Sequence, residues 1–151
     1  MVKKKITKRI YNKRASFDYQ LGDSLTVGIA LDGPETKAAR NGSVQLKGAY
    51  VNIINNELWL INATISGSAS SPINDTDKVR NRKLLARRKE IDRLIREKNS
   101  GLTIIPIELL NKSRYIKLKI ALGKGKKNYD KRDSIKKREQ ERKIQGYTHT
   151  K

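Results

Sequence analysis

The sequence contains no cysteine. This absence excludes a disulfide scaffold, a zinc site built from cysteine, and a cysteine nucleophile. No window of about 18 apolar residues is present, so no membrane-spanning helix is expected. The start of the chain is charged and lacks the apolar core of a signal peptide. We therefore expect a cytoplasmic protein without a membrane partner.

The sequence also lacks a set of residues that could catalyse a reaction. Its single histidine, His149, lies near the end of the chain, where no neighbour would position it as a general base. Asp75 and Asp77 could form a metal pair, but a helix-capping role for Asp77 is favoured. The Gly-Lys-Gly-Lys-Lys run at 123–127 resembles a phosphate loop only superficially, because it lacks the Lys-Ser/Thr ending. We expect no enzyme activity, no metal and no cofactor.

Acidic residues are scarce beside basic ones, since 15 Asp and Glu against 35 Lys and Arg give a formal charge of +20. The bases gather in three blocks. Residues 1–14 hold seven and no acid, residues 78–98 hold ten with three acids, and residues 124–151 hold eleven with four. Any one block could be a solvated surface, but the three together indicate a nucleic-acid partner. RNA is favoured over DNA because no helix-turn-helix, zinc-finger or zipper pattern is present.

The pattern of apolar residues predicts several short strands and one long helix. Two β-rich runs separated by Asn55 and Asn56 indicate a hairpin, because asparagine tolerates the positive φ of a type I′ turn. Strands are expected at 25–31, 49–54, 57–65, 102–110 and 115–122, and helices at 35–41 and 77–99. The fold class is therefore α+β and mainly β, and the architecture that we expect is a small OB-like antiparallel β-barrel with flanking helices.

The end of the chain differs in composition from the rest. From residue 124 onward only Ile135 and Ile144 are aliphatic side chains large enough for a core. Such a segment cannot offset its ordering entropy, so we expect a basic tail that is disordered until it binds a polyanion. The predicted division is a barrel domain at 1–123, with a basic arm at 1–14, and a tail at 124–151. Tyr129, among lysines and arginines, is a candidate for stacking on a base.

Short motifs along most of the chain point to one family. Arg-X-Arg-Lys-Leu-Leu at 80–85 and Gly-Lys-Lys-X-X-Asp-Lys-Arg at 125–132 are the most specific. The others are Asn-Lys-Arg-Ala at 12–15, Asp-Tyr at 18–19, Gly-Pro-Glu-Thr-Lys-Ala-Ala-Arg at 33–40, Glu-Leu-Trp-Leu at 57–60 and Gly-Leu-Thr-Ile-Ile-Pro at 101–106. In this order they resemble the SsrA-binding protein (SmpB) family, the bacterial partners of transfer-messenger RNA (tmRNA).

The resemblance implies an RNA-binding adaptor that binds the tRNA-like domain of tmRNA and delivers it to stalled ribosomes for trans-translation. Its tail would fold as a helix in the decoding region of the small subunit and along the empty messenger path. Elongation factor Tu would be an indirect partner through the aminoacylated RNA. A structural ribosomal protein, or another translation factor that binds ribosomal RNA, is the alternative.

The resemblance also assigns residues by position. The residues expected at the tmRNA surface are Asn12, Lys13, Arg14, Glu35, Lys37, Arg40, Arg80, Arg82 and Lys83. Those expected in the decoding region are Lys124, Lys126, Lys127, Tyr129, Asp130, Lys131 and Arg132. The chain departs from the usual family pattern at Phe17, Thr26, Thr64 and Lys78. Phe17 replaces a frequent histidine, and Thr26 replaces a frequent acid near the expected RNA surface.

Overall fold

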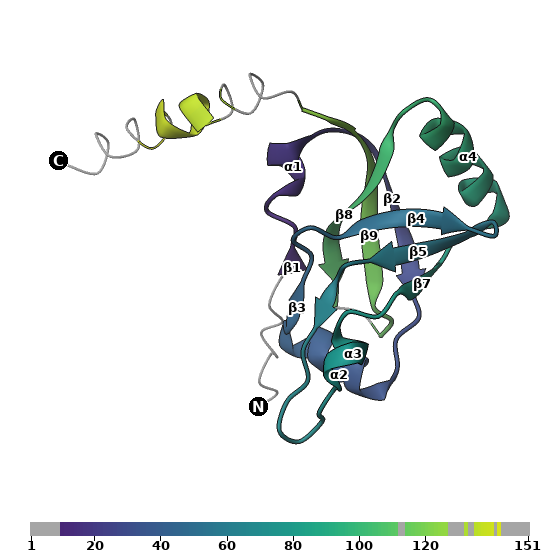
Figure 1. Cartoon of the computed structure of the whole chain (residues 1–151), viewed down its shortest axis with the longest axis vertical. Helices are drawn as coiled ribbons and strands as arrows, with labels where there is room; N and C mark the ends of the chain where they lie inside the picture. Colours follow the sequence, from purple (N-terminus) through teal and green to yellow (C-terminus); the bar gives the residue numbers. More distant parts are fainter. Residues whose placement is uncertain (1–9, 112–113, 127–131, 133–134, 141, 143–151) are drawn as a thin grey trace.

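A computed structural model of the chain describes residues 10–111, 114–126, 132, 135–140 and 142. Its central feature is a ring of antiparallel strands, in the order β8-β4-β5-β7-β2-β9 with β9 pairing back to β8 (Figure 1). The short strand β1 (Ile10–Tyr11) adds to β8 outside the ring. The ring strands are β2 (Tyr19–Ile29), β4 (Tyr50–Ile54), β5 (Glu57–Ile61), β7 (Arg82–Leu85), β8 (Thr103–Leu110) and β9 (Lys117–Gly125). The prediction of a mainly β, OB-like barrel is confirmed.

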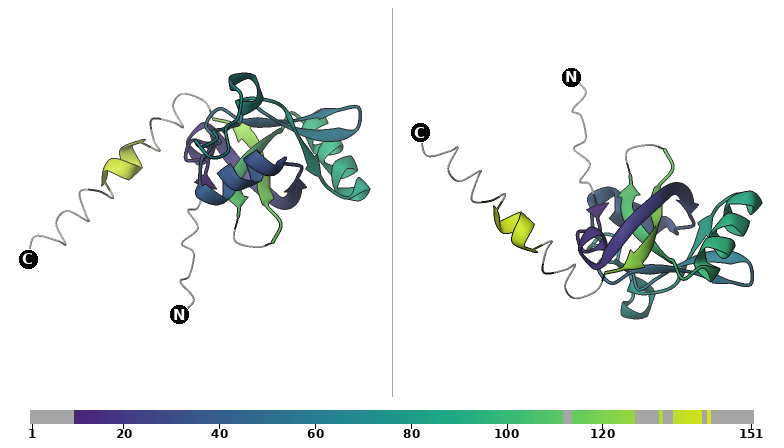
Figure 2. Two further views of the ribbon diagram at one scale, coloured as in Figure 1. Left: turned by 90° about the horizontal axis from the view of Figure 1, so that it is seen from below. Right: turned by 90° about the horizontal axis from the view of Figure 1, so that it is seen from above.

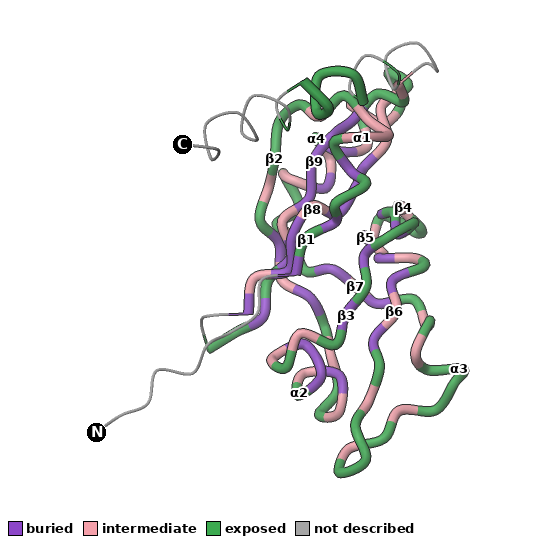
Figure 3. The backbone as a smooth tube through the Cα atoms, turned by 90° about the vertical axis from the view of Figure 1, so that its left-hand side faces the viewer, coloured by how far each residue is buried: buried purple, intermediate pink, exposed green. Residues whose placement is uncertain are grey.

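The core fills the inside of the ring, because the strands alternate apolar inward residues with polar outward ones. The side chains of Ile116, just before β9, and of Leu118, Ile120 and Leu122 within it are buried as predicted, and Lys117 is exposed. In β5 the alternation buries Leu58 and Leu60 and leaves Trp59 half-buried on the outer face. Figure 3 shows the buried residues concentrated in the barrel strands, whereas the loop that leads to α3 is largely exposed.

Two local predictions are confirmed. Asn55 and Asn56 have φ values of 52° and 62° and join β4 to β5 in an antiparallel hairpin. The expected helix at 35–41 is α2 (Gly33–Asn41), which begins two residues earlier because Asp32 and Glu35 form a capping box. Gly42, with φ of 81°, ends the helix in the left-handed conformation.

Helix α2 lies across one end of the barrel, as the view from below shows (Figure 2). Its Ala38 and Ala39 are buried in the core, together with residues of the small sheet formed by β3 (Val44–Gln45) and β6 (Thr64–Ile65). The strand expected at 57–65 is therefore two strands, β5 and β6. They are separated at Asn62, which has a φ of 64°. Between β1 and β2 the chain forms one helical turn, α1 (Ala15–Asp18), which contacts β2 and β8.

The prediction of a single long helix at 77–99 is wrong. The segment contains the short helix α3 (Asp75–Lys78), then strand β7, then helix α4 (Arg88–Asn99). Asp77 lies inside α3 and does not cap a long helix. Strand β7 closes the ring between β5 and β2, with Leu84 opposite both Leu58 and Ile29. The ladder hydrogen bonds and core packing of this strand outweigh the helix propensity of its lysine, arginine and leucine residues.

Helix α4 packs outside the barrel and buries only Ile91 and Leu94, while its basic residues other than Lys98 are exposed. Lys98 Nζ donates to Asn52 Oδ1 and ties the end of the helix to β4. No helix in the described ranges is long and apolar enough to cross a membrane.

The barrel extends slightly beyond the predicted domain boundary, because β9 continues to Gly125, opposite Tyr19 of β2. Within the predicted tail, residues 135–140 are helical and exposed.

Candidate nucleic-acid interface

The first cluster of predicted site residues is buried. Glu35, from the first turn of α2, is 1% exposed and Arg82, from β7, is 0% exposed. Arg82 Nε donates to Glu35 Oε2 at 2.5 Å, and Arg80 Nε donates to the same oxygen at 3.1 Å. Arg80 Nη2 donates to Glu35 Oε1. The carboxylate is therefore held between two guanidinium groups.

The ionised form of Glu35 is favoured in this setting. Burial alone would raise its pKa, but the hydrogen bonds from Arg80 and Arg82 outweigh burial and lower the pKa of Glu35 below its ordinary value of 4.5. A buried charge of this kind is tolerated only when it is paired and hydrogen-bonded.

The remaining donors of Arg82 hold the backbone around it. Nη1 donates to the carbonyl oxygens of Ala63 and Arg80, and Nη2 to those of Asp77 and Lys78, each at 3.0 Å. The side chains of Glu35 and Arg82 are thus not at the surface, and their predicted contact with RNA is not available to them in this structure. Their positions fix α2, α3 and β7 relative to one another.

Arg40 also has a structural set of contacts. Its Nη1 donates to Asn111 O at 3.0 Å and its Nη2 to Arg114 O at 2.5 Å. Asn111 Nδ2 donates in turn to Ala39 O at 2.8 Å. These bonds hold the end of β8 and the residues that lead into β9 against α2. Arg40 therefore positions Arg114 and Tyr115 at the barrel surface.

Three neighbouring strands form a surface with the features that RNA needs, which we call the β7–β2–β9 face. Leu85 of β7 and Lys117 of β9 lie on either side of Gly28 of β2, in register with it. Thr26 lies opposite Lys119 in the same pair of strands. The face consists of Lys83, Leu85, Thr26, Gly28, Lys117 and Lys119, whose side chains, where present, point away from the core. It combines positive charge with exposed apolar surface.

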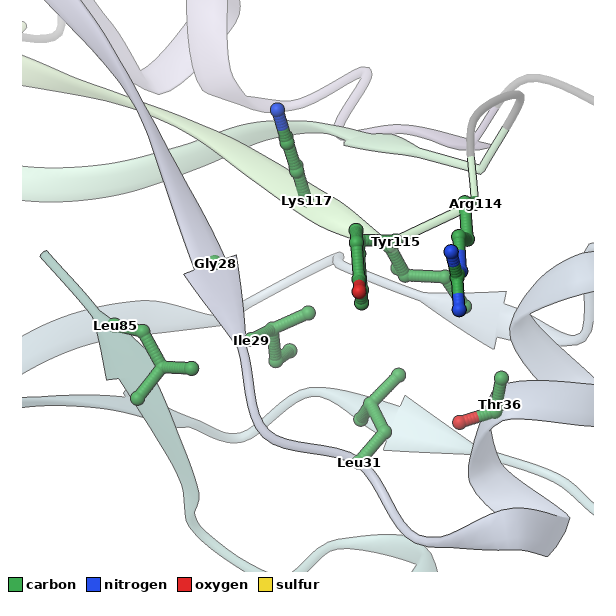
Figure 4. A pocket seen from close by; sticks show the side chains of 9 residues that line it. Gly28, Ile29, Leu31, Thr36, Leu85, Arg114, Tyr115 and Lys117 are labelled. Carbon is green, nitrogen blue, oxygen red and sulfur yellow. The ribbon is translucent and has the colours of Figure 1, made fainter.

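A hollow of about 360 Å³ opens on this face (Figure 4). Ile29 and Leu31 from the end of β2, with Leu85, supply apolar walls, and Tyr115 and Arg114 stand at the opposite side. Tyr115 is 67% exposed and Leu85 is 54% exposed. Gly28 leaves room here, since a Cβ at this position would lie 3.2 Å from Leu85 Cβ. An exposed aromatic ring with basic neighbours is a platform on which bases stack.

Sequence reasoning missed Leu85, Tyr115 and Lys117 as site residues. The signal at Leu85 was an apolar residue at the outward position of a strand, but the segment was expected to be helical. The signal at Tyr115 was an aromatic residue directly beside Arg114 at the beginning of a strand.

The other predicted contacts divide between the surface and the interior. Lys13, Arg14 and Lys37 are exposed, and Lys37 Nζ donates to Ser70 Oγ at 3.3 Å. Lys83 is partly exposed and pairs with Glu57 at 3.3 Å. Asn12 is buried beneath α1. Lys83 alone of the predicted set belongs to the β7–β2–β9 face.

The predicted decoding residues are described only in part. Lys124 and Arg132 are exposed, and the backbone N–H of Lys126 donates to Asp18 O at 2.9 Å. Lys127, Tyr129, Asp130 and Lys131 lie outside the described residues, as does His149. Among the residues that the structure describes, no group of three or more His, Asp or Glu could hold a metal ion.

Comparison with known proteins places the chain in one family. The model of the SmpB protein family matches residues 9–150. The SsrA-binding proteins of Streptococcus thermophilus (strain CNRZ 1066) and Enterococcus faecalis (strain ATCC 700802 / V583) are each 42% identical over 134 residues, covering 88% of this chain and 87% of theirs.

A solved structure agrees with these relatives. A chain in "tmRNA-SmpB: a journey to the center of the bacterial ribosome" superposes with a TM-score of 0.65 and 34% identity, over 80% of this chain and 85% of that one. The residues that match the family model include every strand of the barrel. The chain belongs to the SmpB family.

Proposed function

We propose that this chain binds the tRNA-like domain of tmRNA and delivers it to stalled ribosomes for trans-translation. The observation that carries the proposal is the β7–β2–β9 face, where an apolar hollow is lined by an exposed tyrosine and Lys117, and Lys83 and Lys119 belong to the same face. Lysines bind the phosphate backbone without reading sequence, and the aromatic ring takes an unstacked base. Membership of the SmpB family supports tmRNA and the ribosome as the partners.

The residues of the first predicted set then have two roles. Lys13, Arg14 and Lys37 are exposed and Lys83 is partly exposed, and these four side chains would contact RNA directly. Glu35, Arg40, Arg80 and Arg82 would act as positioning residues, because their hydrogen bonds hold α2, β7, Asn111 and Arg114 in place beside the face. Asn12 is buried, so its side chain is not available for such a contact in this structure.

The tail would serve the ribosome. We propose that Lys124, Lys126, Lys127, Tyr129, Asp130, Lys131 and Arg132 enter the decoding region, with the following helix along the empty messenger path. The helical and exposed residues 135–140 support this assignment, since they include Lys136, Lys137 and Arg138 and none of them is buried against the barrel. Ribosomal RNA would neutralise their charge. Elongation factor Tu would be met only through the aminoacylated RNA, in the cytoplasm, and no enzyme activity is proposed.

The test of the proposed RNA face compares two lysine reversals. Lys117→Glu places a negative charge beside the hollow, and we expect it to weaken binding of a labelled tRNA-like-domain transcript about tenfold. Lys89→Glu makes the same change on α4, where Lys89 is exposed and away from the face, and should cost less than about twofold. Fluorescence anisotropy at fixed salt gives both dissociation constants. Equal losses in the two variants would mean that net charge and not this face governs binding.

A further inference from the structure

A second, smaller cavity lies on another part of the barrel. Its volume is about 170 Å³, and it opens between α1, the beginning of β2, the loop before β4, and β8. None of its lining residues lines the hollow of the β7–β2–β9 face. The residues that matter for its chemistry are Asn12, Arg14, Asp18, Tyr19, Tyr50 and Thr103.

Asn12 lines this cavity and has a buried side-chain atom without a hydrogen-bond partner. The residue is 8% exposed, and its backbone N–H donates to Ile107 O at 2.8 Å while its carbonyl accepts from Ala15 N at 3.1 Å. Its Nδ2 donates to Pro106 O at 2.9 Å. Its Oδ1 is buried and has no partner, and it is the only such side-chain atom in the described part of the chain.

The unpaired oxygen is not explained by a rotated amide. Rotation would bring Oδ1 against the carbonyl oxygen of Pro106 and would lose the hydrogen bond that Nδ2 makes. Leaving a buried acceptor without a donor is costly, and such groups in folded proteins call for an explanation, such as a bound molecule. The described residues supply no donor to this oxygen, and a molecule in the cavity would reach it only if the cavity wall opened.

The walls indicate which donor fits. Tyr19 and Tyr50 place two aromatic rings in the lining, and Thr103 adds a hydroxyl. Arg14 also lines the cavity. Its side chain is 54% exposed, and its Nε lies 3.6 Å from Asp18 Oδ2. Aromatic rings bind flat heterocycles, an exposed guanidinium binds phosphate, and Oδ1 accepts from an amino group. The volume lies well below the roughly 300 Å³ of sites for larger ligands, so it suits a single base.

We propose that this cavity binds one unpaired RNA base that carries an exocyclic amino group, with the amino N–H donating to Asn12 Oδ1. Tyr50, at 38% exposure, swings aside to admit the base and then stacks on it. Arg14 contacts the adjoining phosphate. The RNA source rests on the proposed function, whereas the base-binding chemistry does not.

The cavity lies next to the end of β9, where the tail leaves the barrel. Tyr19 is opposite Gly125 in the ladder, and Lys126 N–H donates to Asp18 O at 2.9 Å. A base held here would therefore sit beside the point where the tail leaves the barrel. It could come from the tRNA-like domain or from ribosomal RNA, and the two sources can be told apart.

The base chemistry is tested without any large RNA. The full chain, labelled with ¹⁵N, is titrated with adenosine 5′-monophosphate and with purine riboside 5′-monophosphate, which lacks only the amino group. We expect saturable shifts of the Asn12 side-chain amide and of the backbone amides of Gly48 and Ala49 with the first, and at least about fivefold weaker binding of the second. Equal binding of the two nucleotides, or the same shifts with inorganic phosphate, would overturn the proposal.

Variants keep the test independent of folding. Because Asn12→Ala also removes the hydrogen bond to Pro106, the test uses Tyr50→Ala, a change at an exposed position. It should abolish the saturable shifts, and Tyr50→Phe should keep them because the ring does the stacking. Tyr11→Ala alters a similarly exposed tyrosine on β1 that does not line the cavity, and it should leave the shifts unchanged.

The two RNA sources are separated by affinity. Dissociation constants of wild type and Tyr50→Ala are measured for the tRNA-like-domain transcript and for purified small ribosomal subunits. A loss of about fivefold or more with one RNA supports the proposal and identifies its source. Unchanged affinity for both RNAs overturns it. Failure of the wild type to prefer the tRNA-like domain over other RNA would instead count against the proposed function and would leave the nucleotide titration intact.

Discussion

Arg82 and Glu35 join β7 to α2 through a buried ion pair, although both residues lie among surface-like neighbours in the sequence. Arg82 is flanked by Asn81 and Lys83 in a strongly basic block, which favoured an exposed position. Its guanidinium instead donates to Glu35 and to four carbonyl oxygens. A partner 47 residues away cannot be read from local composition.

Removal of the Glu35 charge should destabilise the fold strongly. In Glu35→Gln the Arg82 guanidinium stays buried without its carboxylate, and loss of one partner of a buried pair costs about 3–5 kcal/mol. The free energy of unfolding in urea measures the loss. Glu57→Gln is the matched control, because it removes a carboxylate from the partly exposed pair with Lys83 and should cost about 1 kcal/mol or less. Similar costs for the two variants would contradict a structural role for the Glu35 cluster.

Stability should depend on acid through the same carboxylate. The pKa of Glu35 is lower in the folded chain than its ordinary value of 4.5, so folding favours its ionised form. Its contribution is therefore fully present above pH 4.5 and is lost as the pH falls through the lower folded-state value. The difference in unfolding free energy between wild type and Glu35→Gln should shrink as the pH is lowered through this range. A difference that stays constant with pH would show that the Glu35 charge does not contribute.

At the scale of elements, the β4–β5 turn depends on the backbone conformation of two asparagines. Asn56 has a φ of 62°, and a residue other than Gly, Asn or Asp loses about 1–2 kcal/mol in this left-handed region. Asn56→Ala should lower the thermal midpoint, whereas Asn56→Gly should keep or raise it. Calorimetry of both variants gives the comparison. An equal decrease in both would indicate that the asparagine side chain, and not the backbone angle, stabilises the turn.

The elements with local sequence signals could be predicted, and those fixed by distant partners could not. The Asn55-Asn56 turn, the α2 segment before Gly42 and the alternation in β9 each have their cause within a few residues. Strand β7 does not, because its residues favour a helix and become a strand only between β5 and β2. The hollow on the β7–β2–β9 face was missed for this reason, since Leu85 faces outward only if residues 82–85 are a strand.

At the scale of the whole molecule, the basic residues of the barrel and those of residues 135–140 differ in how far their charge is neutralised. Part of the charge in the barrel is neutralised by ion pairs, such as Arg93 with Asp23 at 2.7 Å and Lys83 with Glu57 at 3.3 Å. In residues 135–140 the basic side chains are exposed and pack against little besides Phe17, whose ring centre lies 5.8 Å from Arg138 Cζ. The barrel therefore supplies shaped surfaces, whereas the helical residues 135–140 offer exposed positive charge that gains most from a surrounding polyanion.

This division predicts that the barrel and the tail can be separated functionally. Truncation after Lys126 keeps the full β2–β9 ladder and the hydrogen bond to Asp18. The truncated chain should bind the tRNA-like-domain transcript within about threefold of the full chain, since the β7–β2–β9 face is unchanged. It should fail to support peptide tagging on stalled ribosomes in a reconstituted translation assay. Loss of RNA binding on truncation would move the main RNA site from the barrel to the tail.

The helical state of the tail is tested at unchanged length and nearly unchanged charge. Lys137 lies inside the helical residues 135–140, and proline there costs about 3 kcal/mol of helix stability. Lys137→Pro should therefore abolish tagging while leaving the RNA dissociation constant at the wild-type value. Lys137→Ala removes the same charge and favours the helix, so it should tag at close to the wild-type rate. If the alanine variant failed as completely as the proline variant, the lysine charge would be the requirement, and a helix in the messenger path would no longer explain the function of the tail.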